Sequence, residues 1–164
     1  MIEVRRLTSV DRDLLRELRR RAVTESPEAF NTTVADESVL TASDWDARML
    51  ETAYFAGFDG EVPVGLAGGR VNAADWDLVS MWVASEARGT GLVDQLIGAV
   101  CAAAAAAGAE RVGLRVVVGN VRALRVYERW GFVPEGDPER LPRDPSLTRQ
   151  RMYLPVTTST SKLR

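Results

Sequence analysis

A turn with two closely spaced glycines, Arg88-Gly89-Thr90-Gly91, lies between a predicted strand and a predicted helix. Glycine lets a ligand approach the backbone because it has no side chain, and the first N–H groups of a helix have no partner within the helix. These N–H groups and the helix dipole together favour a phosphate or a pyrophosphate. The turn therefore predicts a phosphate-bearing cofactor, although a strand-to-helix turn can also need glycine for its conformation alone.

Other phosphate motifs fit this turn less well. A dinucleotide-binding fingerprint needs a third glycine where the chain has Asp94, whose carboxylate would lie among phosphates. A Walker loop needs Gly-Lys-Ser/Thr, which the chain lacks. We therefore expect neither kind of nucleotide site.

A second polar motif occurs about thirty residues later, where Asn120, Ala123 and Tyr127 follow one another at helical spacing. Residues at i, i+3 and i+7 share one face of a helix. An amide, a small residue and a phenol on one face are poorly suited to an apolar core. They are well suited to the wall of a site for a long polar ligand. The alternative is that Tyr127 is a core aromatic whose hydroxyl has found a partner.

The two motifs, in this order, resemble the acyl-CoA-binding segments of the Gcn5-related N-acetyltransferase (GNAT) superfamily over residues 2–154. The resemblance implies that acetyl-CoA is the acyl donor and that the strand before the glycine turn pairs with pantetheine. Val93 stands where the family usually has a small residue, so it either crowds the pyrophosphate or turns into the core. The implied cofactor-binding residues are Met81, Trp82, Val83, Arg88, Gly89, Thr90, Gly91, Leu92, Val93, Asn120 and Ala123.

The same resemblance implies an enzyme in which an amine attacks the acetyl thioester directly, without an acyl-enzyme, so that Cys101 has no catalytic role. It implies that Tyr127 donates a proton to the departing thiolate. Asp77 or Glu37 could pass the amine proton to water, although each could also be an ordinary solvated carboxylate. The alternative function is a catalytically weak module that binds acyl-CoA as a sensor.

The acceptor side is expected against residues 26–51. Phe30 and Trp45 could form apolar walls there, and the acids of this segment could attract a protonated amine. The alternative is that these acids only solvate a loop and a helix. The acids are Asp36, Glu37, Asp44 and Asp46. On the cofactor side, one or more of Arg122, Arg125 and Arg129 could meet a phosphate, or all three could form a solvated basic face.

Hydrophobic periodicity and turn residues predict the elements that must position these side chains. We expect helices after the capping pattern Thr8–Asp11 and over residues 44–52, 92–107 and 120–130. We expect strands over residues 2–7, 53–58, 62–71, 78–84 and 111–118, from Gly131-Phe132-Val133 onward, and over 147–156. This order predicts an α/β (α+β) fold with a mixed, mostly antiparallel central sheet flanked by helices. The resemblance adds that the sheet is splayed at the acyl-CoA site.

Composition limits the remaining possibilities. The 164 residues suit one domain, predicted over 1–156, with a flexible tail over 157–164. A net charge of -2 disfavours a nucleic-acid partner, and no apolar run is long enough to predict a membrane helix. The chain has no histidine and a single cysteine, so we expect no metal site and a cytoplasmic protein. A homodimer is left open.

Overall fold

The computed structural model describes residues 1–157, in which eight strands form one sheet. The strand order is β1-β2-β3-β4-β5-β8-β6, and β7 pairs with β8 beside this path. The strands are β1 (Ile2–Arg6), β2 (Thr52–Asp59), β3 (Val62–Asn72), β4 (Asp75–Val83), β5 (Arg111–Val117), β6 (Val133–Pro134), β7 (Glu139–Leu141) and β8 (Asp144–Pro155). The predicted tail lies outside the described residues apart from Thr157.

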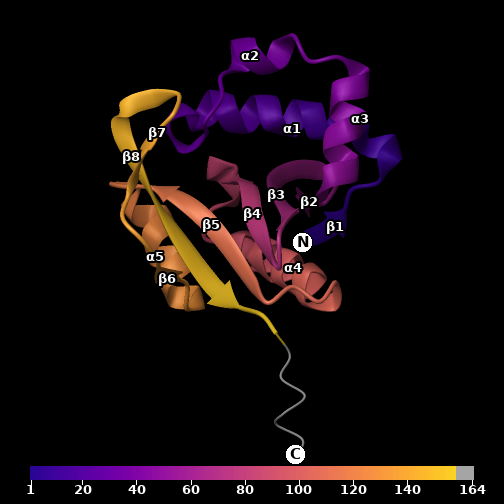
Figure 1. Ribbon diagram of the computed structural model, residues 1–164. Helices are drawn as coiled ribbons and strands as arrows, with labels where there is room; N and C mark the ends of the chain where they lie inside the picture. Colours follow the sequence, from indigo (N-terminus) through magenta and orange to yellow (C-terminus); the bar gives the residue numbers. More distant parts are fainter. Residues whose placement is uncertain (158–164) are drawn as a thin grey trace, which may run out of the picture.

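Helices cover both faces of the sheet. One group packs above it and the other below it in Figure 1. The first group is α1 (Arg12–Glu25), α2 (Val34–Ser38) and α3 (Ala42–Glu51), and the second is α4 (Leu92–Ala106) and α5 (Val121–Trp130). Three short 3₁₀ turns are η1 (Ser9–Asp11), η2 (Pro27–Ala29) and η3 (Ser85–Ala87).

The sheet is antiparallel everywhere except between β4 and β5, which run parallel. These two strands pair at only two positions, Trp76 with Val112 and Asp77 with Gly113, and then separate. Their separation leaves a fork near the middle of the sheet. The predicted mixed, mostly antiparallel and splayed sheet is therefore confirmed.

Glycines in β2 and β3 leave space for the first residue of α4 to pack on the sheet. A Cβ atom built on Gly65 would lie 2.9 Å from Cδ2 of Leu92, and one on Gly57 would also overlap the Leu92 side chain. Because neither glycine has a Cβ, Leu92 can fill the space against β2 and β3 and is 1% exposed. The first residue of α4 is thus fixed at the fork. The helix ends before Gly108, whose φ of +84° matches the predicted stop.

The C-terminal region differs most from the sequence expectation. β7 was not predicted, and β8 begins at Asp144 rather than at residue 147. The two strands form a hairpin whose residues are mainly polar and exposed or half-buried, so their hydrophobic alternation is weak. Arg149 of this hairpin lines the cleft described next.

Candidate functional site

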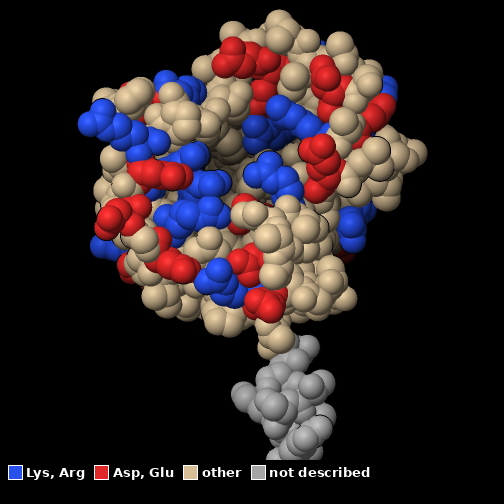
Figure 2. Space-filling model, in the orientation of Figure 1, with Lys and Arg blue, Asp and Glu red and all other residues tan. Residues whose placement is uncertain are grey.

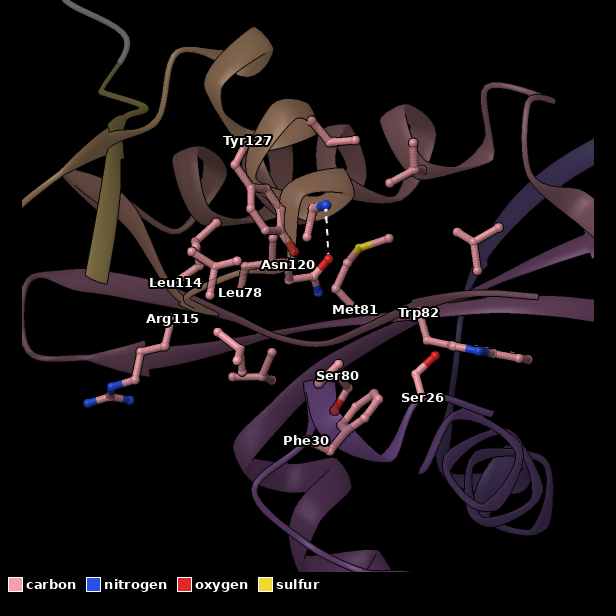
Figure 3. Close-up of a pocket in the computed structure, with 18 of the residues that line it drawn as sticks. Ser26, Phe30, Leu78, Ser80, Met81, Trp82, Leu114, Arg115, Asn120 and Tyr127 are labelled. Atoms are coloured by element: carbon pink, nitrogen blue, oxygen red, sulfur yellow. Dashed lines mark hydrogen bonds between the residues drawn. The ribbon is translucent and has the colours of Figure 1, made fainter. Parts of the chain in front are cut away.

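A cleft of about 1660 Å³ opens at the fork between β4 and β5. Pockets for a single small ligand are typically roughly 300–1000 Å³, so this cleft has room for a long ligand and a second molecule. Its walls come from the α1–α2 connection, β4, β5, β8 and the facing parts of α4 and α5. Figure 3 shows Ser26 and Phe30 on one side of β4 and Asn120 and Tyr127 on the other.

The N-terminus of α4 faces one end of the cleft. Gly91 caps the helix with a φ of +84°, and Gly89 has a φ of +79°. Residues with a side chain rarely adopt this backbone conformation, so glycine is needed at both positions. Asp94, the acid in the first turn, is held by α5: its Oδ1 accepts from Nη2 of Arg129 at 2.9 Å and from Nε1 of Trp130 at 2.8 Å.

The structure brings together most of the residues predicted to bind the cofactor. All except Thr90 line the cleft. The hydroxyl of Thr90 instead donates to the carbonyl oxygen of Ala87 at 2.5 Å and tightens the turn. Leu92 is buried, so its backbone rather than its side chain can serve a ligand. Val93 is half-buried and packs against the core while also reaching the cleft.

Two arginines at this end are available to an anion. Arg88 and Arg122 line the cleft and make no ion pair among the described residues. Arg129 also lines the cleft, but Asp94 neutralises it. Arg125 does not line the cleft. A guanidinium group beside free helix amides is a favourable setting for phosphate oxygens.

Tyr127 lies deep in the cleft on α5. Its ring packs edge-on against Phe132 at 5.7 Å, and Figure 3 shows its hydroxyl pointing toward Asn120 and the β4 residues Leu78 and Met81. Burial raises the pKa of Tyr127 to about 12. The phenol therefore keeps its proton near neutral pH. Asn120 caps α5, because its Oδ1 accepts from the N–H of Ala123 at 3.3 Å.

The β4 strand is irregular beside Tyr127. Its pairing with β3 shifts register between Leu66 and Gly68, and Ser80 has a φ of +57°. Such a bulge re-aims backbone groups that would otherwise join the ladder. Nη1 of Arg19 donates to Oγ of Ser80 at 2.8 Å and so fixes the irregular residue from α1.

Asp77, a candidate base, lies at the base of the fork as the last β4 residue paired with β5. It is 5% exposed and lines the cleft. Nδ2 of Asn72 donates to its Oδ2 at 3.1 Å, and Nη2 of Arg151 lies 3.5 Å from its Oδ1. Among the described residues, Oδ1 is buried without a hydrogen bond. That oxygen is buried and faces the guanidinium group of Arg151.

Glu37, the other candidate base, is in a different environment. Its Oε1 and Oε2 accept from Nε and Nη2 of Arg19 at 3.1 and 2.5 Å, and Nη1 of Arg48 lies 3.4 Å from Oε1. Glu37 is 8% exposed and does not line the cleft. The geometry thus gives Glu37 a supporting position behind Arg19, because its oxygens are already occupied by two guanidinium groups.

The four acids expected to form the acceptor wall lie elsewhere. Asp44 accepts from the N–H of Thr41 at 2.7 Å and caps α3, while Asp46 pairs with Arg12 at 3.2 Å. Neither these two acids nor Asp36 and Glu37 line the cleft. Phe30 does line the cleft, whereas Trp45 is 1% exposed in the core.

Arg143, in the β7–β8 turn, joins the two walls of the cleft, although the sequence did not single it out. Its Nε donates to the carbonyl oxygen of Phe30 at 2.9 Å, and its backbone N–H donates to Oδ1 of Asn31 at 2.9 Å. Its Nη2 also donates to the carbonyl oxygen of Pro27 at 2.9 Å. The β7–β8 turn and the α1–α2 connection are therefore held together, and Figure 1 shows them side by side.

Sequence reasoning also missed the arginines on the sheet itself. Arg149 and Arg151 alternate with other residues along β8, and their i, i+2 spacing puts them on one face. That spacing was the signal available.

Of the described helices, none is long and apolar enough to cross a membrane. Within residues 1–157, no group of three potential ligands is arranged to hold a metal ion.

Comparison with known proteins gives a family-level match. Residues 15–132 match the model of the acetyltransferase (GNAT) family. A search of curated proteins finds no significant match. The matched range contains the glycine turn, the fork and Tyr127.

Several solved structures share the fold at low sequence identity. A protein from Salmonella typhimurium, solved with acetyl-CoA, is 17% identical, with a TM-score of 0.75 over 98% of this chain and 96% of that one. The ribosomal-protein-S18-alanine N-acetyltransferase of Escherichia coli is 16% identical, with a TM-score of 0.73 over 100% and 99%. The spermidine N-acetyltransferase of Vibrio cholerae, solved with CoA and spermine, is 19% identical, with a TM-score of 0.73 over 94% and 95%.

Proposed function

Because the chain belongs to the GNAT family of acetyltransferases, we propose that it transfers the acetyl group of acetyl-CoA to an amine of a small molecule or peptide. The observation that carries this proposal is the fork between β4 and β5, which opens beside Tyr127 and the N-terminus of α4. A bound acetyl-CoA supplies an activated thioester. The residues of this chain bind it, orient it and move protons.

The donor end of the cleft fits a CoA molecule. The first N–H groups of α4 and the side chains of Arg88 and Arg122 would bind its phosphates. Glycine at position 91 keeps side-chain bulk away from them. The unpaired backbone edge of β4 at residues 81–83 would accept the pantetheine arm as an additional strand, because β5 has separated from it there.

Tyr127 is the proposed acid. A phenol whose pKa is about 12 holds its proton at neutral pH and can donate it to a thiolate, which is more basic in a buried cleft than in water. The hydroxyl already points toward Leu78 and Met81 of β4 in Figure 3. A backbone N–H near Met81 or Trp82 would stabilise the oxyanion that forms during attack.

Asp77 is the proposed base. Its Oδ1 has no hydrogen bond among the described residues, with Nη2 of Arg151 3.5 Å away, and the carboxylate would accept the amine proton through a water molecule. Cys101 has no part in the reaction. Burial raises its pKa to about 11, and it does not line the cleft, so it is a poor nucleophile. This supports direct attack by the amine.

The proposal is tested by two measurements on the full chain. Saturating acetyl-CoA should raise the melting temperature, and a panel of amines should include one that drives thiol release. Thermal shift with no turnover by any amine would instead support an acyl-CoA-binding sensor. Loss of both signals would refute the assignment of the cleft.

A further inference from the structure

One row of register partners crosses the sheet at the base of the fork. Arg70 pairs with Asp77, Asp77 with Gly113, and Gly113 with Tyr153. Side chains of register partners lie side by side on the same face of a sheet. A Cβ atom on Gly69 would meet both the neighbouring Trp76 and Val100 of α4, so Trp76 lies on the α4 face and by alternation this row lies on the face covered by α1 to α3.

The next residues of β5 and β8 add more arginines to this face. Arg115 pairs with Arg151, and Val117 pairs with Arg149. All four alternate in step with Gly113 and Tyr153, so they share their face. Arg70, Arg115 and Arg149 also line the cleft. Figure 2 shows basic residues gathered around the central hollow of the molecule.

The acids near these arginines leave guanidinium nitrogens available. Oε1 of Glu139 accepts from Nε of Arg115 at 3.1 Å and from Nε of Arg149 at 2.9 Å, which leaves the outer nitrogens of both groups for another partner. Within residues 1–157, Arg70 has no ion pair. Glu28 and Glu51 also line the cleft. Both are exposed, and neither has an ion pair within residues 1–157.

We infer that the acceptor is an amine that also carries an anionic group, a carboxylate or a phosphate, which Arg70, Arg115 and Arg149 bind. This rests on the proposed function. The planar fork of a guanidinium group matches both anions. With the anion on these arginines, the amine is placed beside Asp77, which belongs to the same row.

The same charges help the chemistry. Only a neutral amine can attack, and nearby positive charges lower the pKa of an amine. A cluster of arginines therefore favours the reactive form while it binds the anion. An acidic wall would do the opposite, since it would stabilise the ammonium form.

Binding to the CoA-saturated protein tests the inference without turnover. Matched probes are amino acids against their α-carboxamides, and phosphoethanolamine against ethanolamine, which separate a carboxylate from a phosphate. We expect the anionic member of at least one pair to bind about tenfold to a hundredfold more tightly at low salt, with a smaller preference at high salt.

Variants assign the preference to the arginines. Arg70→Gln and Arg149→Gln should each weaken binding of the anionic probe about tenfold and leave its uncharged counterpart nearly unchanged. Arg16→Gln, on the exposed side of α1 and away from the cleft, is the matched control. Should Arg149→Gln fail to fold, the exposed Arg70 still provides the test.

Three results would overturn the inference: equal binding within every pair, tighter binding of the uncharged members, or no binding of any anionic probe at millimolar concentration. The proposed function fails by a different result. If acetyl-CoA gives no thermal shift, the donor site itself is wrong, whatever the charge preference of the acceptors.

Discussion

Replacing Glu37 by alanine should destabilise the protein more than it changes the chemistry. The carboxylate is buried and accepts two hydrogen bonds from Arg19, whose own residue exposure is 8%. Removing one partner of a buried ion pair leaves the other charge uncompensated, which typically costs about 3–5 kcal/mol. Arg48 loses part of its pairing as well, because it shares the same carboxylate.

The expected change in melting temperature follows from the size of the chain. For a domain of about 150–250 residues, 1 kcal/mol shifts the melting temperature by roughly 2–4 °C. Glu37→Ala should therefore lower it by about 6–20 °C. Thermal denaturation followed by circular dichroism measures this shift, and urea denaturation measures the free energy of unfolding.

A paired replacement separates stability from positioning. Arg19→Met combined with Glu37→Leu exchanges the ion pair for apolar contact and should recover most of the lost stability. It also removes the donor to Ser80, so kcat should stay below the wild-type value even when the protein is folded. If Glu37→Gln instead abolished kcat with an unchanged melting temperature, Glu37 would be the base and this reasoning would be refuted.

Two further changes test the proposed donor site, and a third tests the inert role of Cys101. Tyr127→Phe should lower kcat by about 10²–10⁴ with little change in acetyl-CoA affinity. An unchanged kcat would show that Tyr127 only packs in the core and does not donate a proton. Because the pKa of Tyr127 is about 12, its proton should produce no fall in the pH–rate profile until strongly alkaline pH. Gly91→Glu should abolish the thermal shift with acetyl-CoA, because the new carboxylate would lie among the phosphates and the φ of residue 91 is +84°. Gly60→Glu, at an exposed glycine that also has a positive φ, is the control for backbone strain alone. Cys101, with a pKa of about 11, should react slowly with iodoacetamide at pH 8, and Cys101→Ala should remain active.

The motifs of the proposed donor half could be found in the sequence because they are local. The glycine turn and the helix that follows it are contiguous, and so are Asn120 and Tyr127 on α5. Helical spacing and glycine conformation are fixed by backbone geometry, so these motifs could be interpreted before the fold was known. The identity of the sheet neighbours was not needed.

The acceptor half depends on pairing between distant strands. Arg70 meets Asp77 only through the register of β3 and β4, and Arg115 meets Arg149 through the register of β5 and β8 and through Glu139. A segment rich in acids looked like the acceptor wall, yet Asp44 caps its own helix and Glu37 turns toward Arg19. Sequence composition does not reveal which partner a charged side chain will choose.

The fork also divides the molecule into two units that could open separately. Strands β1 to β4 span residues 2–83 and strands β5 to β8 span 111–155, so each half of the sheet is continuous in the chain. Two register pairs, α4, the Arg143 contacts with the α1–α2 connection and the ion pairs Arg111–Asp75 and Arg151–Asp77 join them. Cooperative units that share few contacts can exchange their amide hydrogens independently. A ligand lying in the fork cross-links the units, so it should slow exchange in a strand that it never touches, as far away as β1.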